Sequence, residues 1–191
     1  MPAQFPNATP LRSVHRFITT HDASGQAVFE PTTTIPESPP AKVIENGDKF
    51  ILGYATNTTP ADFSSDLPTY AAYLENNPGV MIPGGTVLRF VDMRPGGESP
   101  MHRTVSLDYG VVIEGEIELE LDSGEKRLMK RGDCSVQRGT NHMWRNKSQT
   151  EWARMMYVLV EAKPIVIEGK GELGEDYGVA HDDDAEGCRQ L

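Results

Sequence analysis

Two histidines and one aspartate are the side chains in this chain whose types and spacing could do chemistry together. His102 and Asp108 lie in the stretch 96–115, between a Pro-Gly-Gly turn and a strand-like apolar run. His142 lies in a second stretch, 132–146, which also begins at a glycine turn. We expect the three side chains to converge on one site, because strands project alternate residues to the same face of a sheet.

This set of side chains suits two kinds of chemistry. It matches the two-histidine, one-carboxylate arrangement that binds iron, and zinc or manganese would also accept it. Without a metal, a histidine of near-neutral pKa can move protons, and Asp108 could orient the ring and stabilise its charged form. The alternative is that each histidine is a core residue hydrogen-bonded to the backbone. For His15 and His21, which have no neighbour at ligand spacing, we expect a surface or packing role.

Other residues could contact a substrate beside these three. Arg89 lies in the middle of an expected strand and, if it points inward, could hold a carboxylate or enolate oxygen. An outward, solvated Arg89 is the alternative. The remaining candidates, of which the last two could instead be plain core packing, are Thr104, Tyr109, Gln137, Trp144 and Met156.

Short strands separated by turns are the elements expected to position these residues. From Gly84 onward, apolar β-rich runs alternate with turns, and residues 116–121 (EIELEL) alternate strictly between apolar and acidic. That alternation predicts a strand with one buried and one solvated face. Many such strands with little helix predict an all-β antiparallel sandwich or barrel. One further strand is expected at 49–56 and one short helix at 69–75.

The chain is expected to form one barrel with flanking segments. Residues 1–83 are predicted to be an N-terminal arm, a hairpin and a long loop that pack on the barrel. Residues 84–168 are predicted to form the barrel core, and 169–191 an acidic C-terminal tail. Within the first segment, Asp22–Gly25 is expected to be the turn of the β-hairpin.

Composition and charge narrow the class of protein. A length of 191 residues suggests one domain with a real core, and the net charge of -10 argues against nucleic acid or an anionic membrane as partner. We find no apolar run of membrane-spanning length and no signal pattern at the N-terminus. We therefore expect a cytoplasmic protein that acts on a small molecule, with Cys134 and Cys188 as reduced thiols.

The two stretches resemble the paired motifs of the cupin superfamily, whose members are double-sheet jelly-roll β-barrels. The positions that match the first motif are Gly96, His102, Thr104, Asp108 and Gly115. Those that match the second, with one residue fewer after the first glycine and Gln in place of Pro, are Gly132, Gln137, Gly139, His142 and Asn146. The resemblance covers roughly 87–160. More narrowly, the chain looks like short single-domain cupins found in fungi and bacteria beside polyketide or other secondary-metabolite enzymes.

Two positions depart from the first motif. Thr104 stands where the motif has a second histidine, and a threonine hydroxyl is a poor ligand for a first-row metal. Asp108 stands where the motif has glutamate, which withdraws the carboxylate by roughly 1.5 Å. The family's four-ligand metal site would thus be reduced to His102, His142 and a shortened carboxylate. The expected cofactor is therefore either none or one divalent metal (Fe, Mn or Zn).

Three functions remain open, in the order in which we favour them. The first is a lyase or isomerase, a dehydratase or decarboxylase, that acts on an aromatic or polyketide-type intermediate by His/Asp acid–base chemistry. The second is an Fe(II)-dependent oxygenase with a two-histidine, one-carboxylate site. The third is a non-catalytic cupin that binds a small molecule. The resemblance also implies a homodimer paired through its sheets, with the N-terminal hairpin exchanged or laid across the partner.

Overall fold

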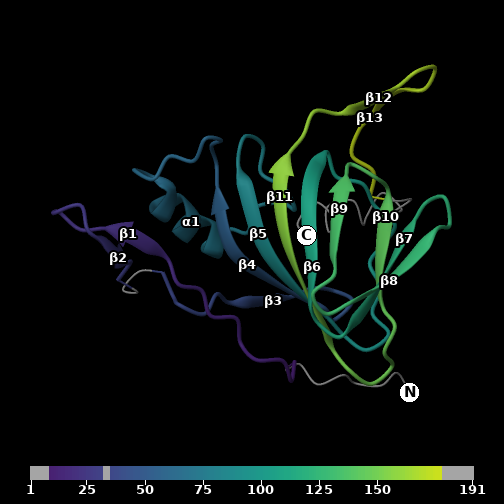
Figure 1. Ribbon diagram of the computed structural model, residues 1–191, viewed down its shortest axis with the longest axis horizontal. Coiled ribbons are helices and arrows are strands. Elements are labelled where there is room, and N and C mark those ends of the chain that lie inside the picture. Colours follow the sequence, from purple (N-terminus) through teal and green to yellow (C-terminus); the bar gives the residue numbers. More distant parts are fainter. Residues whose placement is uncertain (1–8, 32–34, 178–191) are drawn as a thin grey trace.

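Two antiparallel sheets and two small hairpins make up most of the chain in the computed structural model, which describes residues 9–31 and 35–177. The large sheet has six strands in the order β3-β4-β5-β11-β6-β9, and the small sheet has three in the order β10-β7-β8 (Figure 1). The predicted all-β, double-sheet architecture is confirmed. Of the predicted acidic tail, 169–191, residues 178–191 with Cys188 lie outside the described residues, whereas 169–177 include the strand Gly171–Leu173 and Asp176, which forms a bridge to Arg103.

The strand bounds follow the apolar runs of the sequence closely. The large sheet consists of β3 (Ala41–Val43), β4 (Lys49–Thr56), β5 (Thr86–Met93), β11 (Ala153–Glu161), β6 (Ser106–Glu114) and β9 (Cys134–Arg138). The small sheet consists of β10 (His142–Asn146), β7 (Glu116–Leu121) and β8 (Lys126–Lys130). The two hairpins are β1 (Thr19–His21) with β2 (Ala27–Phe29), and β12 (Ile165–Ile167) with β13 (Gly171–Leu173). Strands β3 and β4 lie before residue 84, where the barrel core was predicted to begin. They nevertheless belong to the same sheet as strands that follow it.

The N-terminal hairpin has the turn that its sequence predicts. The Asp22 carboxylate accepts the backbone N–H of Gln26 at 3.0 Å, and Gly25 takes a φ of 81°, which favours glycine. The hairpin β1–β2 lies beyond helix α1, at the opposite end of the molecule from β12–β13 (Figure 1). His15 and His21 are exposed on this part of the chain, as predicted.

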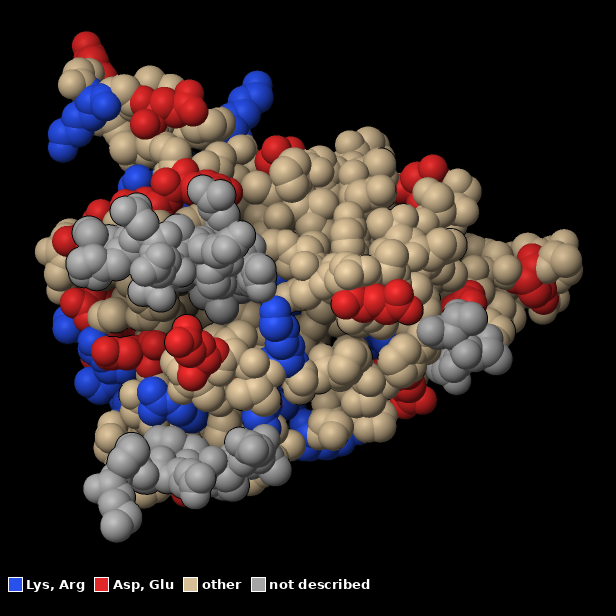
Figure 2. All heavy atoms as spheres, turned by 180° about the vertical axis from the view of Figure 1, so that it is seen from behind, with Lys and Arg blue, Asp and Glu red and all other residues tan. Residues whose placement is uncertain are grey.

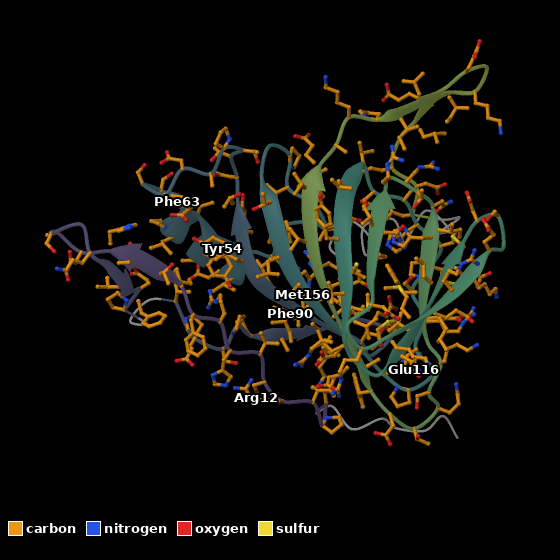
Figure 3. The ribbon with its side chains drawn as sticks, in the orientation of Figure 1. Arg12, Tyr54, Phe63, Phe90, Glu116 and Met156 are labelled. Carbon is orange, nitrogen blue, oxygen red and sulfur yellow. The ribbon has the colours of Figure 1, made fainter. Side chains whose placement is uncertain are left out.

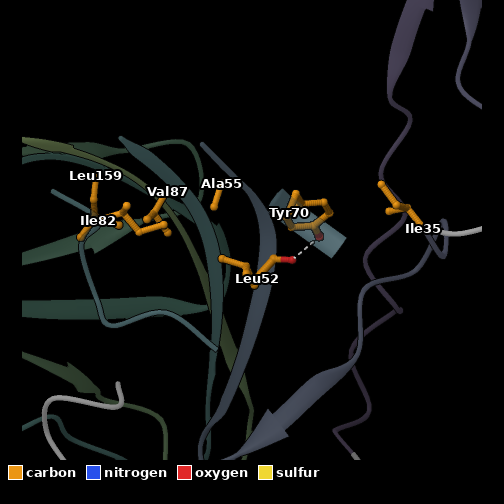
Figure 4. Close-up of a cluster of buried hydrophobic side chains, with 7 residues drawn as sticks. All are labelled: Ile35, Leu52, Ala55, Tyr70, Ile82, Val87 and Leu159. Carbon is orange, nitrogen blue, oxygen red and sulfur yellow. Dashed lines mark hydrogen bonds between the residues drawn. The ribbon is translucent and has the colours of Figure 1, made fainter. Parts of the chain in front are cut away.

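The helix α1 (Asp66–Glu75) begins three residues earlier than predicted. Pro68 lies in its first turn, which tolerates proline because the missing N–H would have no intrahelical partner there. Tyr70, fully buried, anchors the helix to the edge of β4 by donating its hydroxyl to the Leu52 carbonyl at 2.8 Å (Figure 4). No helix in the described part of the chain is long and apolar enough to span a membrane.

Two apolar clusters fill the interior. One consists of Met93, Val112, Ile117, Met129, Trp144, Ala153 and Met155, contributed by both sheets. The other joins α1 to the large sheet and consists of Ile35, Leu52, Ala55, Tyr70, Ile82, Val87 and Leu159 (Figure 4). Burial of these side chains is the main favourable term that holds the two layers together.

Charged side chains cover the outer face of the small sheet. Within β7, Ile117 is fully buried, whereas Glu118 and Glu120 point outward and pair with Arg145 of β10 at 2.8 and 3.4 Å. Figure 2 shows charges gathered on this side of the molecule, while the side of α1 is largely uncharged. The predicted solvated face of EIELEL is confirmed.

The outer face of the large sheet is mostly apolar and holds one buried ion pair. Phe90 of β5 and Met156 of β11 are direct cross-strand partners and lie next to each other in Figure 3. Beside them, Arg154 donates to the Asp92 carboxylate and also, through Nη1, to the carbonyl of Arg12 at 2.7 Å. This pair therefore ties the N-terminal segment to the sheet.

Candidate functional site

A cavity of about 870 Å³ lies inside the barrel, against the inner face of the large sheet. Its wall is largely apolar, because alternate residues of β4, β5, β10 and β11 point into it. The apolar lining residues are Val43, Ile44, Phe50, Val80, Val91, Met93, Trp144, Tyr157 and Leu159. The polar lining residues include Arg89, His102, Thr104 and Asp108. This volume suits a small organic molecule.

Asp108 is a buried carboxylate in the cavity wall, only 5% exposed. Ser106 donates its hydroxyl to Oδ1 at 2.6 Å, and Thr104 reaches Oδ2 at 3.4 Å. Burial raises the pKa of Asp108 to about 6, since removal from water penalises the charged form, and the two hydroxyls only partly oppose this. The carboxyl can therefore take up and release a proton near neutral pH.

His102 lies in the same wall and is held in one tautomer. Its Nδ1 is 2.9 Å from the carbonyl of Pro100, and because a carbonyl can only accept, Nδ1 carries the proton. Burial lowers the pKa of His102, so the ring is neutral at pH 7 and its Nε2 presents a lone pair. The expectation that Asp108 orients this ring is corrected: the Pro100 carbonyl does so.

His142 lies behind His102 and is not part of the cavity lining. The two residues are an antiparallel bridge, with each backbone N–H donating to the other's carbonyl at 2.8 Å and ring centroids 4.3 Å apart. Nδ1 of His142 bonds to the carbonyl of Thr140 at 2.8 Å. Burial, reinforced by the neighbouring His102, lowers the pKa of His142 to about 3. His142 therefore stays neutral across the physiological range.

An aromatic row continues from the histidines across the barrel. The ring of Trp144 meets His142 on one side and Tyr157 on the other, each edge-on with centroids 5.5 Å apart. Tyr157 can lie in this position because Gly110 has no side chain: a Cβ there would come within 3.0 Å of the tyrosine ring. Trp144 and Tyr157 thereby form a rigid aromatic wall for the cavity.

The other predicted substrate contacts are divided between the inside and the outside of the barrel. Arg89 points inward and lines the cavity, as Thr104 and Trp144 also do. Gln137 is buried beside Asp108, its register partner, but is not part of the lining, and its Nε2 has no hydrogen-bond partner.

Two of the predicted contacts face away from the cavity. Tyr109 is 45% exposed and follows the inward-pointing Asp108, so strand alternation directs it outward. Met156 precedes the inward-pointing Tyr157 and is outward for the same reason. The expectation that these two residues contact a substrate is therefore corrected.

Comparison with known proteins agrees with this architecture. The cupin domain family matches residues 89–159. Phomopsin biosynthesis cluster protein D of Diaporthe leptostromiformis is 59% identical over 175 residues, which are 91% of each chain. The chain belongs to the cupin superfamily. The resemblance stated from the two motifs is thus confirmed.

Other relatives of this cupin also come from fungi. Oryzines biosynthesis cluster protein J of Aspergillus oryzae is 53% identical over 86% of this chain and 92% of its own. The cupin-domain-containing oxidoreductase virC of Hypocrea virens is 45% identical over 84% of this chain and 82% of its own. Among solved structures, an RmlC-like cupin from Shewanella frigidimarina is 14% identical over 70% of this chain and 94% of its own, with a TM-score of 0.45.

The cupin family implies a metal, so we asked whether the residues present fit one. Among residues 9–31 and 35–177, no group of three or more His, Cys, Asp or Glu side chains is arranged to hold a metal ion. Both carboxylate oxygens of Asp108 accept hydrogen bonds from hydroxyls, and His142 lies outside the cavity lining. The three residues expected to converge on a metal do not gather into such a site.

Two residues that shape the site, the cavity-lining Tyr157 and the hydrogen-bond donor Ser106, were not among the sequence candidates. Tyr157 was overlooked in favour of its neighbour Met156, although strand parity offered a signal: Arg154 and Met156 share a face, and a charged residue argues that this face is the outer one. Ser106 was also missed, although two-residue spacing places it on the same face as Thr104 and Asp108.

Proposed function

We propose that this cupin is a proton-transfer enzyme, a lyase or isomerase that dehydrates or isomerises a small aromatic or polyketide-type carbonyl compound. The observation that carries the proposal is Asp108, a carboxyl in an apolar cavity wall with a pKa of about 6. Among the described residues it has no cationic partner, so it is not held permanently ionised. A base with a pKa near the working pH is the most effective proton carrier.

In a dehydration, Asp108 acts first as base and then as acid. The carboxylate removes the proton on the carbon next to the substrate carbonyl, and the electron pair moves to form an enolate. The carboxylic acid then returns that proton to the hydroxyl on the next carbon, the C–O bond breaks, and water leaves as the C=C bond forms. Asp108 ends ionised, so the step needs no co-reactant.

His102 positions the substrate in this scheme. Its neutral ring offers an Nε2 acceptor for the substrate hydroxyl, while the Pro100 carbonyl fixes the ring through Nδ1. The aromatic wall of Trp144 and Tyr157 excludes water, which protects the enolate from unproductive protonation.

The test uses an aromatic β-hydroxy ketone whose dehydration gives a conjugated, ultraviolet-absorbing enone. In deuterium oxide, nuclear magnetic resonance also reports exchange of the proton next to the carbonyl. We expect both signals with the wild-type protein and a loss of about a hundredfold or more in Asp108→Asn, the usual loss on removing a general base. Exchange and elimination that persist undiminished in Asp108→Asn would refute the proposal.

Oxidation is the second candidate function. Four relatives that are 38–45% identical carry the name cupin-domain-containing oxidoreductase, which favours this reading. An oxygen electrode separates the two functions on the same substrates, with and without added Fe(II). Oxygen uptake coupled to substrate loss would support oxidation, whereas enone formation without oxygen uptake supports the lyase.

A further inference from the structure

Arg89 occupies an unusual place for an arginine. It lies in the middle of β5, is 4% exposed, and lines the cavity among apolar side chains. Arginine is almost never fully buried unless it is paired, because removing its charge from water is costly. The group that compensates the charge of the buried Arg89 guanidinium therefore bears on the function of the cavity.

The partners of Arg89 satisfy only part of its side chain. Nη2 donates to the carbonyl of Gly79 at 2.9 Å, and the guanidinium carbon lies 5.3 Å from the centre of the Phe50 ring. Nη1 is buried and has no hydrogen-bond partner. Within the described ranges, no Asp or Glu forms an ion pair with Arg89. One donor edge of a fixed cation is thus left without an acceptor.

The same sheet contains a second buried arginine, Arg154, which has a structural role. It is 6% exposed on the outer face, and its guanidinium makes two parallel hydrogen bonds to the Asp92 carboxylate. The carboxylate that completes Arg154 has no counterpart beside Arg89. Because Arg89 faces the cavity, the missing acceptor can come from a bound molecule.

We propose that Arg89 is the anion-binding subsite of the cavity, and that the substrate is an organic acid whose carboxylate accepts from Nη1. Burial lowers the pKa of Arg89 to about 10, which still leaves it protonated at neutral pH. Nη1 is covered by protein atoms, so the carboxylate reaches it with a small rotation of the guanidinium. The gain on binding is large because the site already bears the cost of the buried charge.

Sheet geometry sets the distance between this subsite and the reacting end. Arg89 pairs with Tyr157 of β11, and Asp108 lies on the strand beyond, so two strand spacings, on the order of 10 Å, separate the two backbones. This part of the inference rests on the proposed function of Asp108. The substrate would then have its carboxylate at Arg89, an apolar body along Trp144 and Tyr157, and its reacting carbon at Asp108.

Other charges of the cavity wall favour the same orientation. Glu45 and Asp48 lie in the segment between β3 and β4 and repel a carboxylate from that side. Lys42 also lines the cavity but is exposed, so water screens it. Lys42 is therefore a matched control for Arg89: a cation of the same cavity that is not buried.

The experiment measures binding of naphthoate and of naphthamide by isothermal titration calorimetry. The two probes have the same apolar body and nearly the same shape, but only the first is charged. We expect wild-type protein to bind naphthoate at least about tenfold more tightly, and Arg89→Met to bind both equally. Lys42→Met and Asp108→Asn should keep the preference. Equal affinities in the wild-type protein, or a preference lost in Lys42→Met and kept in Arg89→Met, would overturn the inference.

Failure of the anion subsite and failure of the proposed function give different results in these measurements. If Asp108→Asn loses turnover but keeps the naphthoate preference, the proposed function and the anion subsite are both supported. If the wild-type protein shows turnover but no preference, the lyase proposal stands and the anion subsite is refuted. Thermal unfolding checks that Arg89→Met is folded, and we expect its melting temperature to equal or exceed that of wild type, because an uncompensated buried charge is removed. Should the variant fail to fold, the comparison of the two probes in the wild-type protein still decides.

Discussion

His102 and His142 are joined by a pair of backbone hydrogen bonds, and their ring centroids lie 4.3 Å apart. Only His102 reaches the cavity. Both rings have Nδ1 bonded to the carbonyl two residues earlier, so both present Nε2 as the free nitrogen. His102 can therefore contact a substrate, whereas His142 lies next to His102 and supports it.

Replacement of His142 by asparagine tests this division of roles. The Asn amide can still donate to the Thr140 carbonyl, so the loop keeps its anchor while the ring is lost. We expect turnover to fall by no more than about tenfold, with an unchanged pH profile, because the His142 ring stays neutral across the physiological range and does not line the cavity. His102→Asn should cost considerably more. Equal losses in the two variants, measured as initial rates on the β-hydroxy ketone, would contradict the assignment.

The strands of the barrel could be predicted from the sequence, whereas the hydrogen-bond partners of the site residues could not. The alternation of EIELEL and the placement of turns defined β7 and its neighbours, because strand parity and turn chemistry act over a few residues. The inward direction of Arg89 could not be chosen from the sequence, since a lone arginine fits either face. The hydroxyl partners of Asp108 and the carbonyl partners of both histidines depend on side-chain and backbone positions that spacing does not specify.

The pH dependence of turnover should report Asp108. A base must be ionised, so the rate is expected to fall as the pH drops through about 6. Ser106 lowers the pKa of Asp108 by donating to it, so Ser106→Ala should move the acidic limb to higher pH. Ser123→Ala, in the exposed turn between β7 and β8, is the control and should leave the profile in place. A limb unmoved by Ser106→Ala would mean that another group titrates.

Asp108→Asn should stabilise the folded protein at neutral and alkaline pH. The folded-state pKa of Asp108 lies above the ordinary aspartate value of 3.8, so the charged carboxylate disfavours folding, and stability is lost as the pH rises through about 6. The asparagine of the variant does not ionise, so the variant does not lose this stability. We expect it to gain on the order of 3 kcal/mol above about pH 7, with the difference vanishing below about pH 4. Denaturant melts at both pH values measure this, and a variant less stable than wild type at pH 8 would contradict it.

The homodimer implied by the cupin resemblance stays a prediction. The outer face of the large sheet is the surface through which two copies could pair. Tyr109 and Val136 are direct cross-strand partners on the outer face of the large sheet, 45% and 54% exposed. If a second copy covers this face, Tyr109→Glu places a charge in the contact and should yield monomers. Size-exclusion chromatography with light scattering measures the mass, with Leu128→Glu on the small sheet as control. A wild-type monomer would remove the prediction.

Thr104→His restores the residue that the first cupin motif has at this position, and it tests why the metal donors do not gather. Thr104 lines the cavity beside Asp108, so a histidine there would place a third nitrogen donor near His102 and free one carboxylate oxygen. We expect the purified wild-type protein to keep its proton-transfer activity after dialysis against a chelator. The variant should bind Zn(II) or Fe(II) more tightly, by at least about tenfold, as plasma mass spectrometry after equilibrium dialysis would show. Stoichiometric metal in the wild type, lost together with activity on chelation, would instead assign His102 and Asp108 to a metal and overturn the acid–base scheme.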